Sequence, residues 1–326
     1  MRKQVAVGID IGGTNTVFGI VARDGSILAN GTIKTKDFEE VEVFVAALHE
    51  KIQVILNRIG NGHNIIGYGI GAPMGNINKG TIEHAATLPW KGIIPLADYF
   101  KKHSELPVIV TNDANAAAVG EMVFGGAQGM RNFVVITLGT GLGSGFVVDG
   151  KLVYGEDGFA GEIGHTAIRP GISNRECGCG KKGCLETYVS ASGIKRTVLK
   201  IMADSIQKSE LRSLSFDALD SKKIHTAALN GDAIALEAFK HTGQMLGFKL
   251  ADLVAHTNPE AIFLFGGLAL AKDLIFEPAK EYMENHLLNI YRDKVKLLPS
   301  KLSTQNAAVL GASSLVWSNT EVPHIQ

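Results

Sequence analysis

This sequence has very few cysteines and no excess of charge of either sign. Its 326 residues include three cysteines and nine prolines, and 32 lysines and arginines balance 32 aspartates and glutamates. An odd number of thiols excludes a framework in which every cysteine is paired in a disulfide. Balanced charge does not favour a surface that binds polyanions, so we expect no nucleic-acid partner.

Long apolar runs are also missing. No segment approaches the roughly 20 apolar residues that a membrane-spanning helix needs, so we expect no membrane partner. The N-terminal segment MRKQVAVGIDIGG starts with basic residues, but Asp10 interrupts its apolar run. This pattern indicates a first strand and not a signal peptide. Without such a peptide, an odd number of cysteines fits a reducing compartment, and we expect a cytoplasmic protein.

The few cysteines are gathered in one short segment. They follow a histidine and lie between Glu162 and Glu186, in the order His165, Cys177, Cys179, Cys184. Glycines between the thiols allow a tight loop that directs several sulfurs at one point. Three thiolates and an imidazole complete the tetrahedral set of a structural zinc site. The alternative is a reactive or incidental cluster of cysteines.

Two parts of the chain repeat one plan of strand, glycine turn, strand and Asp-Gly hairpin. Residues 9–14 (IDIGGT) align with residues 136–141 (ITLGTG), and each copy continues into a second strand. This repetition predicts two similar α/β domains that face one another. Helical periodicity predicts a helix over residues 38–59, and residues 186–257 are expected to be largely helical with a break near 209–223.

Three glycine turns follow buried strands in this pattern. Such turns can direct backbone N–H groups at a phosphate, and two carry a threonine hydroxyl as well. They comprise Gly12, Gly13 and Thr14, then Thr140 and Gly141, and finally Gly266 and Gly267. None matches the P-loop pattern. The repeated turns indicate a shared nucleotide site, and the alternative is that they are structural turns.

Two aspartates lie where strands end. Asp10 would be costly in a buried strand unless it is paired or near a cation, so it is a candidate partner of Mg²⁺, or else it caps its own turn. Asp113 is a candidate general base, or else a helix cap. Together with Asn112, Glu162, His165 and Glu186, it supplies the donors and acceptors that a polyol needs.

Several motifs together resemble the ROK family of bacterial sugar kinases, repressors and related proteins. They are IDIGGTNT, NDANAAAVGE, ITLGTGLGSG, GEIGHTAIRP, CGCGKKGCLE and FLFGGL, which span nearly the whole chain in the family's order. The resemblance implies a two-domain actin-like/hexokinase-like ATPase fold with ribonuclease H-like repeats and an interdomain cleft. The implied domains are residues 1–111 with 303–326 and residues 112–302.

The resemblance also implies roles for individual residues. Asp113 is expected to be the catalytic base of an ATP-dependent hexose kinase. Sugar contacts are expected from Gly75, Asn76, Thr87, Asn112, Glu162, His165 and Glu186. ATP and Mg²⁺ are expected near Asp10, Gly12, Gly13, Thr14, Thr140 and Gly141, with Gly266 and Gly267 on the adenosine side. Structural Zn²⁺ is expected on His165, Cys177, Cys179 and Cys184.

The sugar and the function class have alternatives. Residues 69–90 resemble the glucokinase segment that ends in Asn-Leu-Pro-Trp, but Thr87 replaces the asparagine and residues 74–76 depart from Gly-Pro-Val. Glucose is expected first, with N-acetylmannosamine, N-acetylglucosamine, fructose or allose as alternatives. The first strand begins close to Met1, which leaves no room for the repressors' DNA-binding helices. A non-catalytic sugar-binding regulator, or a chaperone-type ATPase, are the rival functions. The family likeness suggests a homodimer.

Overall fold

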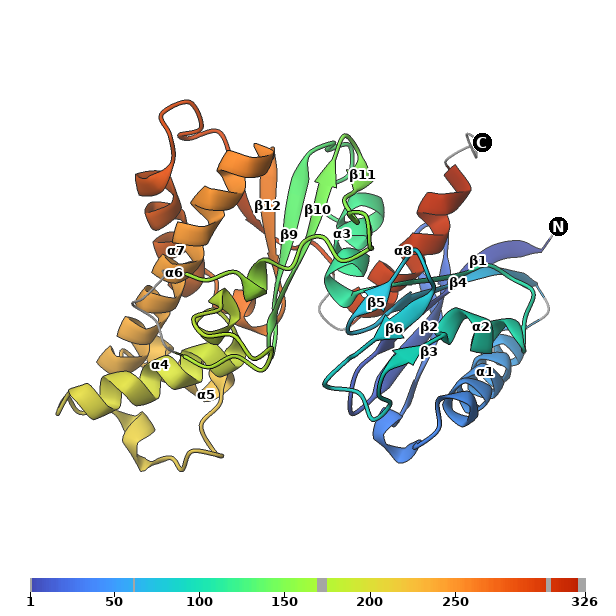
Figure 1. The fold of residues 1–326 in the computed structure, drawn as a ribbon, viewed down its shortest axis with the longest axis horizontal. Helices are drawn as coiled ribbons and strands as arrows, with labels where there is room; N and C mark the ends of the chain where they lie inside the picture. Colours follow the sequence, from blue (N-terminus) through green and yellow to red (C-terminus); the bar gives the residue numbers. More distant parts are fainter. Residues whose placement is uncertain (1, 61, 169–174, 303–305, 322–326) are drawn as a thin grey trace.

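The computed structural model describes residues 2–60, 62–168, 175–302 and 306–321, and Figure 1 shows them as two α/β halves, each with its own sheet. The first sheet has the strand order β3-β2-β1-β4-β8 and the second β11-β10-β9-β12-β13. The strands of the first are β1 (Lys3–Ile11), β2 (Thr16–Ala22), β3 (Ile27–Ile33), β4 (His63–Gly71) and β8 (Val108–Thr111). Those of the second are β9 (Phe133–Leu138), β10 (Leu142–Val148), β11 (Lys151–Leu152), β12 (Ala261–Phe265) and β13 (Lys296–Pro299).

The two sheets share one topology, which agrees with the repetition in the sequence. In each, an antiparallel meander supplies three strands and two further strands join in parallel. The predicted correspondence of residues 9–14 and 136–141 places both segments at the end of the sheet's central strand. A third, small sheet joins β5 (Gly75–Asn76), β6 (Thr81–Glu83) and β7 (Ile93–Ile94).

Helices cover both faces of each mixed sheet, because apolar side chains on both faces must be buried. On the first sheet, α1 (Val41–Arg58) and α2 (Leu96–Lys101) bury one face and α8 (Ala307–Glu321) the other. On the second, one face is covered by α4 (Ala191–Asp204), α5 (Ser221–Leu229), α6 (Ala233–Thr257) and α7 (Asp273–His286), and the opposite face by α3 (Asp113–Phe124).

Short 3₁₀ segments complete the described secondary structure: η1 (Thr35–Asp37), η2 (Ile163–His165), η3 (Leu185–Thr187), η4 (Glu210–Ser213) and η5 (Gly267–Ala271). The prediction of a helix over residues 38–59 is confirmed as α1, which begins three residues later. The helical region predicted over residues 186–257 is confirmed as α4, α5 and α6, and its break as the segment between α4 and α5.

Helices α3 and α8 pack against each other between the two sheets (Figure 1). A methyl group added at Gly120 of α3 would lie 2.8 Å from the Cα atom of Gly311 of α8, so the contact requires glycine. Because α3 begins at Asp113, this contact places the first turn of α3 at the junction of the halves.

The division into residues 1–111 with 303–326 and 112–302 stays a prediction, and 303–305 and 322–326 fall outside the described residues. Among the helices that the structure describes, none combines the length and the apolar character needed to cross a bilayer.

Candidate functional site

The ends of three neighbouring strands bring Asp10 and Asp113 together. Asp10 of β1 is paired with Gly71 of β4, which is paired with Thr111 of β8. Gly71 carries no side chain between them. A methyl group there would lie 3.6 Å from the Cα atom of Asp113 and 3.8 Å from Oδ1 of Asp10. Both carboxylates therefore lie at the same edge of the first sheet.

The start of α3 shows whether Asp113 caps the helix or is available as a general base. Asn112 is the N-cap, and its Oδ1 accepts a hydrogen bond of 2.6 Å from the Asn115 backbone N–H. Asp113 is the first helical residue, and its Oδ1 accepts from the Ala114 N–H at 2.9 Å. The cap expected at Asp113 is thus made by Asn112, which leaves Oδ2 of Asp113 without a role in the cap. A carboxylate in the first turn is also stabilised by the helix dipole.

The surroundings of both aspartates oppose ionisation. Solvent reaches the Asp113 side chain, but protein atoms surround its carboxyl group, and this desolvation raises its pKa. Asp10 is half-buried, and burial, with a smaller contribution from the charge of Asp113, raises its pKa from 3.8 to about 7. A carboxylate whose pKa is raised toward neutrality is a stronger base than a free aspartate.

The raised pKa of Asp10 predicts a pH-dependent stability. The folded protein binds the proton of the Asp10 carboxyl group more tightly than the unfolded chain does. The contribution of this proton to the free energy of unfolding is therefore fully present below pH 3.8 and is lost as the pH rises through about 7. The change corresponds to at most about 4 kcal/mol, and partial exposure reduces it to about 2 kcal/mol. We expect Asp10→Asn to be more stable than the wild type at pH 8 and equally stable near pH 4.

Urea unfolding at several pH values, without nucleotide or magnesium, measures this difference. Asp24→Asn is the control, and its stability relative to the wild type should change in the opposite direction with pH. Asp24 is exposed, and its pKa is lowered because its Oδ1 accepts the Ser26 backbone N–H at 2.9 Å. A difference between Asp10→Asn and wild type that does not change from pH 4 to pH 8 would refute the prediction.

Glu162 extends the group of carboxylates toward the second half. It is half-buried, and desolvation raises its pKa, with added contributions from Asp113 and Glu186 and an opposing one from His165. The side chain of Asn112 is close enough to lower the pKa of Glu162 slightly. A helix cap and a loop carboxylate thus lie near each other beside Asp113.

Glu186 connects the cysteine loop to the glycine turn after β9. Its Oε2 accepts a hydrogen bond of 3.0 Å from the Leu142 N–H, and its Oε1 lies 3.6 Å from Sγ of Cys177. A methyl group at Gly141 would lie 2.3 Å from Oε2, so only glycine allows this approach. Glu186 therefore fixes the distance between the turn and the cysteine loop.

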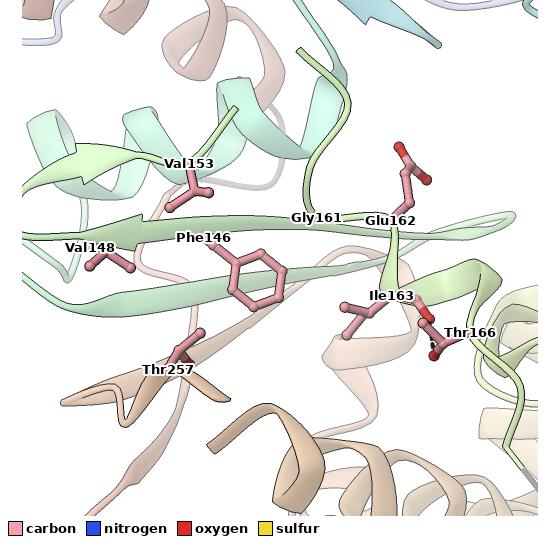
Figure 2. Close-up of a pocket in the computed structure, with 8 residues that line it drawn as sticks. All are labelled: Phe146, Val148, Val153, Gly161, Glu162, Ile163, Thr166 and Thr257. Atoms are coloured by element: carbon pink, nitrogen blue, oxygen red, sulfur yellow. Dashed lines mark hydrogen bonds between the residues drawn. The ribbon is translucent and has the colours of Figure 1, made fainter. Parts of the chain in front are cut away.

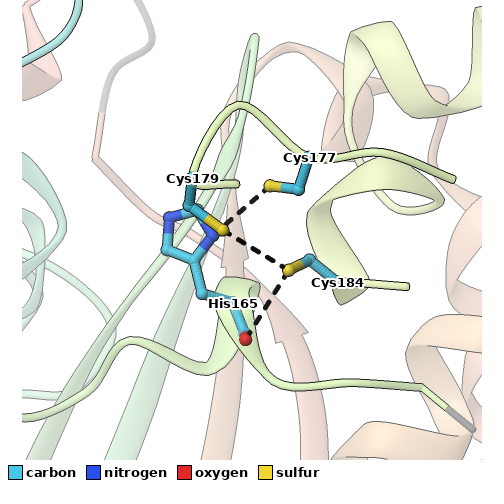
Figure 3. Close-up of side chains that lie close together, drawn as sticks. All are labelled: His165, Cys177, Cys179 and Cys184. Carbon is cyan, nitrogen blue, oxygen red and sulfur yellow. Dashed lines mark hydrogen bonds between the residues drawn. The ribbon is translucent and has the colours of Figure 1, made fainter. Parts of the chain in front are cut away.

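The predicted metal ligands converge on one point (Figure 3). The ligand atoms of His165, Cys177, Cys179 and Cys184 all lie within 4.8 Å of one another. Sγ of Cys177 lies 3.6 Å from Nδ1 of His165, and Sγ of Cys179 lies 3.7 Å from Sγ of Cys184. Tetrahedral zinc requires about 3.6 Å between a sulfur and a nitrogen and about 3.8 Å between two sulfurs. The four residues fit a zinc ion.

Two of the predicted glycine turns make close contacts with other backbone segments. A methyl group at Gly13 would lie 2.2 Å from the carbonyl oxygen of Thr87, so the turn of residues 12–14 packs against exposed Thr87. Gly266 has a φ of 101° and approaches the Leu138 carbonyl, which brings the turn of residues 266–267 beside Thr140. These contacts place the first turn against Thr87 and the third turn against the end of β9, and the role of the turns in nucleotide binding stays a prediction.

Asn76 differs from the other predicted sugar contacts. It and Gly75 are buried in the small sheet. The Asn76 amide donates to the Asp157 carbonyl at 2.8 Å, and its Oδ1 accepts from the backbone of Asn78 and Lys79. A sugar contact from this side chain would have to replace a bond to protein. Its position makes it a link between the small sheet and the loop that leads to Glu162.

Two contributions were missed from the sequence. The first turn of α4 holds the glycine turn after β9: the Ala191 N–H donates to the Gly139 carbonyl at 2.9 Å, and Ser192 Oγ to the Thr140 carbonyl at 3.0 Å. Ser190, an N-cap residue, was a usable signal for this helix start. Tyr154 hydrogen-bonds to the Thr111 side chain, and burial raises its pKa to about 12; no motif marks it.

An apolar cavity of about 430 Å³ lies beside this group (Figure 2). Its walls are Phe146, Val148, Val153, Gly161, Glu162, Ile163, Thr166 and Thr257. In Figure 2 the Glu162 side chain points away from Phe146 and Thr257. The walls offer few hydrogen-bonding groups, so this cavity is distinct from the polar site around Asp113.

Comparisons with known proteins agree with this arrangement. A family model described as the ROK family matches residues 6–319. A glucokinase of Halalkalibacterium halodurans is 36% identical over 325 residues, covering 97% of this chain and 96% of that protein.

Solved structures with the same fold include kinases and regulators. A ROK family glucokinase from Streptomyces griseus, in complex with glucose and AMPPNP, has a TM-score of 0.78 and 31% identity over 96% of this chain and 99% of that one. A ROK family transcriptional regulator, a homologue of the E. coli MLC protein, has a TM-score of 0.85 and 26% identity over 97% of this chain and 78% of that one.

Proposed function

Because this chain belongs to the ROK family and has its two-domain actin-like/hexokinase-like fold, we propose that it is a hexose kinase. It transfers the terminal phosphoryl group of ATP to the primary 6-hydroxyl of a hexose, with glucose as the first candidate. The observation that supports this most directly is the position of Asp113, in the first turn of α3 with Asp10 on one side and Glu162 on the other.

The acceptor sugar is held by groups around Asp113. Asn112 and Glu162 lie near each other and offer oxygen and nitrogen atoms to hydroxyls. His165 and Glu186 contribute from the loop of the metal ligands, and exposed Thr87 from the segment that packs on Gly13. Gly75 and Asn76 shape this side of the site from within the small sheet.

Asp113 acts as the general base. The O–H bond of the 6-hydroxyl breaks and its proton passes to the Asp113 carboxylate. The hydroxyl oxygen then bonds to the γ-phosphorus, and the bond from that phosphorus to the oxygen of ADP breaks. Desolvation raises the pKa of Asp113, which makes its carboxylate a better proton acceptor than a free aspartate.

ATP lies against the three glycine turns. Gly12, Gly13, Thr14, Thr140 and Gly141 surround its phosphates, and Gly266 and Gly267 lie on the adenosine side. The glucokinase from Streptomyces griseus was solved with AMPPNP, an analogue of ATP, which supports this nucleotide. Asp10 would hold Mg²⁺ or its water ligands, and that cation would neutralise charge on the phosphates.

Zinc has a structural role in this proposal. The spacing of His165, Cys177, Cys179 and Cys184 suits a closed tetrahedral site with no open position for a reacting water. The ion would hold the loop that ends at Glu186. No step of phosphoryl transfer passes through it.

We further propose that residues 1–111 with 303–326 and residues 112–302 close as two domains over the substrates, which excludes water from the reaction. The protein is proposed to be a cytoplasmic homodimer. Sedimentation measures the oligomer, and a monomer at micromolar concentration would contradict it.

The second candidate is a sugar-responsive regulator without catalysis, which the likeness to an MLC homologue favours. A coupled assay of ADP release with Mg²⁺ and ATP separates the two. We expect ADP release with glucose, and weaker release with N-acetylmannosamine, N-acetylglucosamine, fructose and allose. Glucose binding by calorimetry without ADP release for any sugar would instead establish a regulator.

A further inference from the structure

Arg175 precedes the cysteine loop and makes three hydrogen bonds to neutral acceptors. Its guanidinium donates to the Thr187 carbonyl at 2.7 Å, to the Gly193 carbonyl at 3.1 Å and to Oγ1 of Thr197 at 3.1 Å. Bonds from a charged donor are stronger than neutral ones. The bonds come from two terminal nitrogens, Nη1 and Nη2, which the single nitrogen of a lysine ammonium cannot both replace.

The guanidinium is held between the loop and α4. Arg175 is half-buried, and its guanidinium carbon lies 4.1 Å from the ring centre of Tyr188. Burial lowers its pKa, but an arginine stays charged. A desolvated cation bonded on three sides is a costly arrangement that ordinary loop packing does not require.

Its bonds join three parts of the proposed active site. The backbone carbonyl of Arg175 accepts from the Gly183 N–H at 2.9 Å, which closes the base of the cysteine loop. Thr187 directly follows Glu186, which holds the Leu142 N–H. Gly193 lies in the first turn of α4, the turn that bonds to the carbonyls of Gly139 and Thr140.

We propose that Arg175 is a positioning residue for phosphoryl transfer, which rests on the proposed function. It locks the cysteine loop, the sugar ligand Glu186 and the phosphate-binding turn of residues 139–141 into one unit. Loss of the Arg175 side chain therefore weakens the binding of both substrates. It also loosens the attachment of the metal loop to Thr187 and α4, while the backbone bond to Gly183 remains. The residue touches neither substrate and takes no proton.

The test compares Arg175→Met with Arg196→Met. Arg196 also reaches the cysteine loop from α4, where its Nη1 donates an exposed hydrogen bond of 2.9 Å to the Glu176 carbonyl. We expect Arg175→Met to raise the KM for glucose and the KM for ATP by roughly tenfold each, the effect of losing charge-assisted bonds. The change in kcat is expected to be smaller, and Arg196→Met should match the wild type.

A second readout does not depend on activity. Transfer of zinc from the protein to a colorimetric chelator should be at least about tenfold faster in Arg175→Met, because a loop that is no longer held to Thr187 and α4 opens more often. If Arg175→Met does not fold, Arg175→Lys replaces it, and the same changes are expected at smaller size because lysine cannot reach all three acceptors.

Either of two results in a folded Arg175 variant overturns the proposal. The first is that both KM values stay within twofold of the wild type, and the second is that zinc transfer keeps the wild-type rate. A lowered melting temperature without these changes would show a structural role only. Failure of the proposed function is separate, because the wild type would then release no ADP with any hexose. In that case the zinc-transfer rate of the Arg175 variants still decides whether Arg175 holds the loop.

Discussion

Asp113→Asn is expected to lower hexose turnover by about 100-fold or more while the dissociation constant for glucose stays nearly unchanged. The amide has the size of the carboxyl group, and its oxygen can still accept the Ala114 N–H. The cap on Asn112 is untouched, so α3 keeps its start. Only the ability to accept the proton of the 6-hydroxyl is lost. Initial rates of ADP release and calorimetry with glucose measure the two quantities.

The pH dependence gives this experiment a second check. The base must be ionised, so the rate of the wild type falls as the pH drops through the pKa of Asp113, which burial raises above 3.8. The residual rate of Asp113→Asn should lack this decline. Asp204→Asn, which alters an exposed ion pair with Lys200, is the control and should keep wild-type rates. Near-normal turnover by Asp113→Asn would remove the assignment of the base.

Cys184→Ser is expected to reduce the zinc content from about one ion per chain to near zero, because a hydroxyl is a poor zinc ligand. Cys184 is buried, with its sulfur 3.7 Å from that of Cys179. Glu186 lies two positions further along. We therefore expect the KM for glucose to rise roughly tenfold or more, because the loss of residues that only support metal ligands already lowers metal affinity or activity by about that factor. Elemental analysis and initial rates measure both effects.

A variant in the same loop controls for a general disturbance. Gly178 lies between Cys177 and Cys179, and a methyl group there meets no atom within 4 Å. Gly178→Ala should therefore keep both the zinc and the KM of the wild type. If Cys184→Ser loses its zinc but binds glucose as before, the metal does not hold the sugar ligands in place.

The metal ligands and the repeated halves were readable from the sequence for different reasons. The three cysteines lie within eight positions, so their ligand set depends on local spacing alone. Strand, turn and hairpin recur in the same order, and a recurring order predicts a recurring fold. The structure agrees on both: the four ligand atoms converge, and the two sheets share one strand order.

Other features could not be read, because partners far apart in the chain create them. The sequence left open whether Asp113 caps the helix, and in the structure the N-cap is Asn112. Asn76 is still predicted to lie at the sugar, but the bond from its amide to the Asp157 carbonyl, 81 positions away, could not be read from the sequence. Arg175 carries no motif, since its acceptors are two backbone carbonyls and a hydroxyl that any sequence can supply.

By itself the sequence determined the types of chemical group and their local spacing: which residues can bind a metal, which turns are open to a phosphate, and which strands repeat. Tertiary structure alone decided which groups meet. Asp10 and Asp113 are neighbours because β4 inserts a glycine between their strands, and Glu186 reaches the turn after β9 because Gly141 leaves space for its carboxylate. Local patterns reflect the backbone's own preferences, whereas these contacts depend on how strands and helices far apart in the chain pack together.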